Sequence, residues 1–152
     1  MFTFYLLLKF IHIAAAITAV GANVTYVVWN VRAQQDAAHM GFALKGIQFL
    51  DNRIANPAYG VVLVTGLLMV FVGRWSITSL WILAAVVLYV VVAVVGVAVY
   101  SPVLKNQIRL ADAGDTSSPE FVAASRRSAM VGPILGLVVA VILVMMVFKP
   151  TL

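Results

Sequence analysis

Four long apolar runs constrain this chain more than any other feature of its sequence. They cover approximately residues 2–31, 57–73, 79–101 and 129–148. About 20 residues of α-helix cross a ~30 Å hydrocarbon core, and lipid requires every backbone polar group to be satisfied within the spanning structure. The runs therefore predict an all-α fold, an integral membrane antiparallel four-helix bundle that forms a single domain over residues 1–152.

The composition agrees with a membrane protein and excludes several other classes. Hydrophobic residues make up 64% of the chain and charged residues 10%, and the mean hydropathy is +1.08, whereas soluble domains are nearer ~45–50% apolar and ~25% charged. The net charge of +5 fits anchoring to anionic lipid, and no free basic stripe indicates a nucleic-acid partner. The chain has no cysteine, which excludes disulfides, thiol catalysis and thiolate-bound metal.

The distribution of charge predicts the orientation in the membrane. All five acidic residues and most basic residues lie in the two long connections, residues 32–56 and 101–128. The basic residues there are Arg32, Lys45, Arg53, Lys105, Arg109, Arg126 and Arg127. The positive-inside rule then gives a multi-pass protein of the cell membrane with both long loops in the cytoplasm and both termini outside.

The long loops are expected to contain helix. Residues 40–50 place their apolar side chains on one helical face, which predicts a short amphipathic helix lying on the inner membrane surface. The third run can continue as helix past Pro102 to Gly114, and Ser118 can cap the helix that leads into the fourth run. Asn56 followed by Pro57 predicts the start of the second span, with Asn56 as its N-cap.

A stripe of polar and small residues follows the first run at alternating steps of four and three, and it should face the other helices. Its members are Tyr5, Lys9, His12, Ala16, Ala19, Asn23, Tyr26 and Asn30. A second face of small residues in the fourth run, formed by Gly132, Gly136 and Ala140, should allow close approach of another helix in the bundle or in a homodimer.

Helical rise indicates which residues can meet the stripe. His12 comes to about the depth of Tyr89, with Thr65 and Gly66 about one turn nearer the outer surface and Lys9 one turn above His12. These five residues form a candidate binding pocket in the outer half. In the inner half, a second set of side chains should tie the helices together. Its members are Asn23, Tyr26, Asn30, Arg53, Asn56, Tyr59 and Tyr100.

The segments "YLLLKFIHI" and "RIANPAYGVVLVTGLLMV" resemble an uncharacterised family of short bacterial membrane proteins allied to the CopD copper-resistance membrane domain and to HemJ. In the HemJ-like relatives, the histidine of an L-K-x-x-H pattern is associated with haem b. The resemblance therefore implies that His12, after Leu8 and Lys9, ligates haem iron, with Lys9 beside a propionate. No second intramembrane histidine is present in the sequence, so the iron would be five-coordinate or would take a ligand from a partner.

Three classes of function stay open on the sequence. A haem- or porphyrin-binding protein accounts for Lys9 and His12, although His12 can also serve only as a hydrogen-bonded core residue and Lys9 can extend to the surface. A non-catalytic subunit of a larger membrane complex accounts for the small size and the small-residue faces. A permease for a small solute, metal or proton would need polar groups that continue across the middle of the membrane, where the stripe contains only Ala16 and Ala19. Enzymatic activity would require a cofactor to supply the reactivity.

Overall fold

The computed structural model describes residues 2–150, and throughout this range the regular secondary structure is helical. The elements are α1 (Phe2–Gln35), η1 (Ala37–His39), α2 (Met40–Leu50), η2 (Asp51–Ala55), α3 (Asn56–Val72), α4 (Leu80–Val95), η3 (Gly96–Tyr100), α5 (Ser101–Asp112) and α6 (Pro119–Phe148). Within residues 2–150, four continuous helices are long and apolar enough to cross a membrane. The all-α membrane bundle predicted from the sequence is confirmed.

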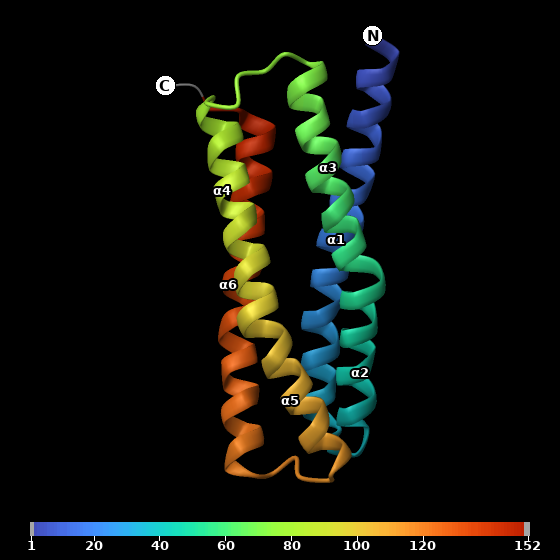
Figure 1. Ribbon diagram of the computed structural model, residues 1–152. Helices are drawn as coiled ribbons and strands as arrows, with labels where there is room; N and C mark the ends of the chain where they lie inside the picture. The colour runs from blue at the N-terminus through green and yellow to red at the C-terminus, as the bar shows by residue number, and fades with distance from the viewer. Residues whose placement is uncertain (1, 151–152) are drawn as a thin grey trace.

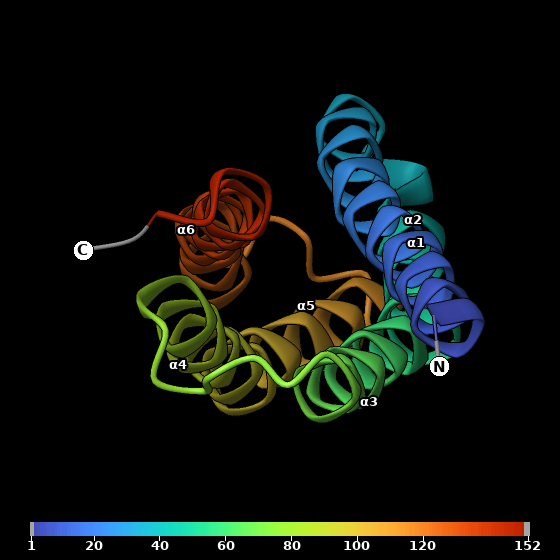
Figure 2. The same ribbon diagram turned by 90° about the horizontal axis from the view of Figure 1, so that it is seen from above.

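The helices form two hairpins (Figure 1). In the first hairpin α1 packs against α2 and α3, and in the second α4 and α5 pack against α6. The hairpins meet mainly where α2 contacts α5, whereas α3 and α4 are not closely packed along their lengths although they are consecutive. Figure 2 shows α4 and α6 together on one side and α1 and α2 on the other. We call the end with Phe2 and Phe148 the terminal end, and the opposite end the loop end.

Pro57 and Pro102 both lie inside continuous helices, Ala37–Val72 and Leu80–Asp112. The prediction that Asn56 is an N-cap was therefore wrong, because its backbone is right-handed helical and its N–H bonds to the carbonyl of Asp51. Proline lacks an N–H, and its ring collides with the carbonyl four residues earlier in an α-helix. The π-helical turns η2 and η3 end two residues before these two prolines and absorb the local mismatch.

The helix predicted at residues 40–50 forms, but it does not lie on a membrane surface. Ala43, Leu44 and Ile47 are buried, and α2 packs against α1 and α5. The predicted position of this helix was wrong because η2 joins α2 to α3 as one continuous helix. The apolar face of α2 is therefore directed at the bundle and not at lipid. In contrast, the predicted continuation of helix past Pro102 is confirmed, and α5 ends before Gly114, which has a φ of +75°.

The bundle is longer than a bilayer is thick. The 34 residues of α1 extend over about 51 Å at helical rise, against a hydrocarbon core of ~30 Å. Ion pairs gather at the loop end, where Lys45 Nζ lies 2.7 Å from Asp112 Oδ1 and an Arg109 nitrogen lies 3.0 Å from Glu120 Oε1. Exposed apolar side chains gather toward the terminal end. The loop end is therefore the part that extends beyond the hydrocarbon core.

Of the small-residue face predicted on α6, Gly132 is directed toward the bundle and Gly136 is not, which leaves the alternative of contact with a second chain as a prediction. A Cβ on Gly132 would lie 3.9 Å from the Tyr100 ring, but a Cβ on Gly136 would meet nothing within 4 Å. The buried residues of this stretch are Ser128 and Val139, with Leu135 packed against the core. Large apolar side chains bury more surface than glycine, and this rotates the Gly136 face outward.

Candidate functional site

His12 projects from α1 against α3 in the terminal half of the first hairpin. Its Nδ1 lies 3.0 Å from the hydroxyl oxygen of Thr65. A Cβ at the position of Gly66 would lie only 3.1 Å from Cε1 of the His12 ring. Glycine at this position therefore gives the imidazole room to pack against the backbone of α3. Three of the five residues predicted to form the outer pocket are brought together here.

The hydrogen bonds of Thr65 determine which nitrogen of His12 carries the proton. The Thr65 hydroxyl donates to the carbonyl of Val61 at 2.6 Å, which uses the only hydrogen it has. In this arrangement its oxygen accepts from His12, which assigns the proton to Nδ1 and the lone pair to Nε2. Within residues 2–150, no hydrogen-bond partner is recorded for Nε2. In many metal-binding histidines, the ring nitrogen that does not bind the metal likewise donates a hydrogen bond, and this bond fixes the orientation of the ring.

The other two residues predicted for the outer pocket lie elsewhere. The Tyr89 hydroxyl donates to the main-chain carbonyl of Tyr59 at 3.0 Å, and its ring stacks edge-on with the Tyr59 ring. Lys9 is exposed. His39 is also remote from His12, at the loop end, where its Nδ1 lies 2.7 Å from Asp36 Oδ2. This contact holds the pKa of the Asp36 carboxyl below its ordinary value.

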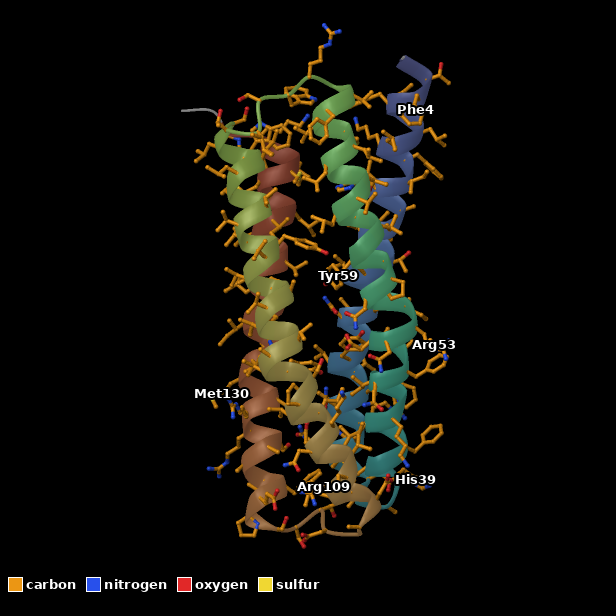
Figure 3. The ribbon with its side chains drawn as sticks, viewed as in Figure 1. Phe4, His39, Arg53, Tyr59, Arg109 and Met130 are labelled. Carbon is orange, nitrogen blue, oxygen red and sulfur yellow. The ribbon has the colours of Figure 1, made fainter. Side chains whose placement is uncertain are left out.

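A second polar cluster lies between the hairpins toward the loop end. The Asn23 amide donates to the Tyr59 hydroxyl, and the Tyr26 hydroxyl donates to Asp51 Oδ1 at 3.3 Å. Tyr26 and Tyr100 are both buried in the main core. Figure 3 shows Tyr59 directed into the space between the hairpins and Arg53 directed away from the bundle. The set predicted to tie the helices together thus assembles, except for Arg53.

Sequence reasoning missed Asp51 and Ser128 in this region, and Gln107 nearer the loop end. Ser128 and Gln107 are buried, with 7% and 2% of their surfaces exposed. Asp51 was read as a loop residue because Pro57 suggested that helix started after it. The spacing of Tyr26 and Asn30 on α1 already indicated a polar inner face. A helix that continues through Pro57 would have placed Asp51 opposite this face of α1.

Aromatic side chains join the hairpins at the terminal end. The rings of Trp75 and Trp81 pack edge-on at 5.7 Å between centroids. Lys149 Nζ lies 5.3 Å and 5.4 Å from the centres of these rings, a cation–π arrangement. Because Lys149 follows α6 and Trp75 follows α3, this group connects segments that are distant in the sequence.

Metal-binding and cavity features are sparse in the part of the chain that the structure describes. Residues 2–150 contain no group of three or more histidine, aspartate or glutamate side chains that could hold a metal ion. A shallow surface depression lies on the exposed side of α6, lined by Pro119, Val122, Ala123, Arg126, Arg127 and Met130. It is separate from both polar clusters. Any metal bound near His12 would therefore need ligands from a cofactor or a partner.

Comparison with protein families gave one match that covers most of the chain. Residues 6–150 match the family described as predicted integral membrane protein, DUF2269. The chain belongs to the DUF2269 family. Comparison with curated proteins gave no match, and comparison with solved structures gave none. Membership in DUF2269 agrees with the four membrane-crossing helices and extends over both hairpins.

Proposed function

We propose that this DUF2269 protein binds haem b, or a closely related metalloporphyrin, through Nε2 of His12. The observation that carries the proposal is the hydrogen bonding of Thr65. Because the Thr65 hydroxyl donates to Val61, it orients His12 with Nδ1 protonated and Nε2 available as a ligand. Neutral imidazole is an established axial ligand of haem iron.

The residues present would supply one imidazole to a haem and not two. His12 is the histidine held at the α1–α3 contact, while His39 lies at the loop end beside Asp36. Bound haem would supply electron transfer or reaction with oxygen or a reducible substrate. The protein would position the imidazole and limit the access of water. Lys9, one turn nearer the terminal end, would lie where a propionate carboxylate meets the membrane surface.

The main test is the absorption spectrum of protein expressed with ample haem and purified in detergent. We expect a Soret band that is lost in His12→Ala and weakened in Lys9→Ala. Thr65→Val keeps the size of the side chain but removes the hydrogen bond to His12, so it should reduce haem retention by about tenfold. Thr18→Val is the matched control, because the Thr18 hydroxyl bonds only to Ala14 in its own helix.

Colourless wild-type protein that also takes up no added hemin would contradict the proposal. A second candidate function would then be a non-catalytic subunit of a larger membrane complex or a homodimer. The exposed Gly136 position, where a Cβ would meet nothing within 4 Å, favours this candidate because a partner helix could approach it closely. A permease is less well supported, since Ala19 is buried between the two polar clusters with 1% exposed.

A further inference from the structure

Asp51 is distinguished from the other acidic residues by its surroundings. Three of the remaining four lie beside basic side chains: Asp36 by His39, Asp112 by Lys45 and Glu120 by Arg109. Within residues 2–150, no ion pair involves Asp51. Arg53 is the nearest basic residue in the sequence, but it is exposed and directed away from the bundle (Figure 3). The Asp51 carboxylate therefore has no protein cation to balance its charge.

The hydrogen bonds to Asp51 are few and long. Tyr26 donates to Oδ1 at 3.3 Å and the Asn56 amide donates to Oδ2 at 3.4 Å, near the upper limit for such bonds. A carboxylate has about four lone-pair positions. Tyr26 also lies near Tyr59 and Tyr100, and we call Asp51 together with these three tyrosines the Asp51 cluster. The lone-pair positions of Asp51 that these two bonds leave unused are available to a further ligand.

The backbone departs from regular α-helix at the same level. Proline has no N–H to donate, so Pro57 and Pro102 each leave a carbonyl of the preceding π-helical turn without its usual donor. These turns are η2, which contains Asp51, and η3, which contains Tyr100. Such π-helical turns are frequently located at functional sites. The Asp51 cluster thus combines one carboxylate with tyrosine side chains from both hairpins.

Gln107 is a second buried polar side chain that the protein leaves without a partner for its oxygen. Its side chain is 2% exposed, and its Oε1 has no hydrogen-bond partner. A buried acceptor without a partner is costly, so it requires water or a bound ion. Gln107 lies seven residues beyond Tyr100 on α5, about 10 Å nearer the loop end by helical rise. It therefore lies between the Asp51 cluster and the loop end.

We propose that the Asp51 cluster binds a monovalent inorganic cation, which reaches it from the loop end past Gln107. Oxygen ligands are those that hard cations prefer. The single carboxylate matches one positive charge, whereas sites for divalent cations usually contain more carboxylates. The site is separate from His12 and does not depend on haem binding.

Thermal unfolding of the purified full-length protein in detergent tests the proposal. Sodium, potassium and lithium chloride are compared with choline chloride at equal ionic strength and at fixed pH. We expect at least one of the three alkali cations to raise the Tm of wild type by about 5 °C at saturation, because it binds only the folded state. Asp51→Asn should lose this response.

The control variant is Asp115→Asn, which makes the same change of charge in an exposed turn and should keep the full response. If Asp51→Asn does not fold, Tyr26→Phe serves instead, because it removes one oxygen ligand and should weaken cation affinity several-fold. An equal response in wild type and Asp51→Asn would overturn the proposal. A Tm of wild type that responds to pH but to none of the three cations would also overturn it, and would assign Asp51 to proton binding.

Discussion

The hydroxyl of Tyr89 on α4 donates a hydrogen bond to the main-chain carbonyl of Tyr59 on α3, at 3.0 Å. This bond joins the two hairpins at a level where α3 and α4 are not closely packed. The edge-on contact of the two rings, with centroids 6.4 Å apart, supports the same junction. Tyr89 therefore links the hairpins and does not contribute to the His12 site.

Tyr89→Phe tests this link. The variant keeps the ring contact and removes only the hydrogen bond, so we expect a loss of about 1 kcal/mol in stability, seen as a lower Tm in detergent. Tyr5→Phe is the matched control, because no hydrogen bond of the Tyr5 hydroxyl is recorded among the described residues. Equal Tm values for the two variants would show that the hydroxyl of Tyr89 does not join the hairpins.

Gly66→Ala tests the packing of His12 against α3. In a helix interior, glycine to alanine normally stabilises by about 1 kcal/mol. At Gly66 the new Cβ would lie 3.1 Å from the His12 ring, so the ring must move and the gain should be lost or reversed. Gly60→Ala, on the same helix with nothing within 4 Å, should show the normal gain. The measurement is the difference in Tm, and a similar gain in both variants would place His12 away from α3.

Gly136→Leu separates packing within the chain from association between chains. Since a Cβ at this position meets nothing within 4 Å, we expect the variant to fold with the wild-type Tm at protein concentrations where it is monomeric. If the Gly136 face binds another helix, the large side chain should prevent this contact and lower the oligomeric mass. Light scattering in detergent measures that mass. A large loss of monomer stability would instead show that Gly136 is packed within the bundle.

Asp115→Cys tests the predicted orientation. Asp115 lies in the connection between α5 and α6, at the loop end, and the chain contains no other cysteine. The positive-inside rule places this connection in the cytoplasm. A membrane-impermeant thiol reagent should therefore modify the variant only after the cells are opened. Labelling of intact cells would contradict the predicted orientation and indicate the opposite one.

The sequence by itself determined the class of fold and the inward face of α1. Four apolar runs of sufficient length permit only helices in lipid, and the periodicity of the stripe from Tyr5 to Asn30 placed Ala19 and Tyr26 in the core, where they are buried. It also predicted that His12 would meet Thr65 and Gly66. These results depend on helical geometry alone, which is the same in every α-helix.

The tertiary structure decided how the helices continue and which faces they bury. Pro57 signals the start of a helix in the sequence, but here the π-helical turn before it joins α2 to α3 and carries Asp51 to Tyr26. The face that α6 buries is likewise decided by packing: the larger Val139 is buried, and Gly136 is left outside the core. Such outcomes depend on the free energy of packing against residues distant in the sequence, and local periodicity contains no information about that partner.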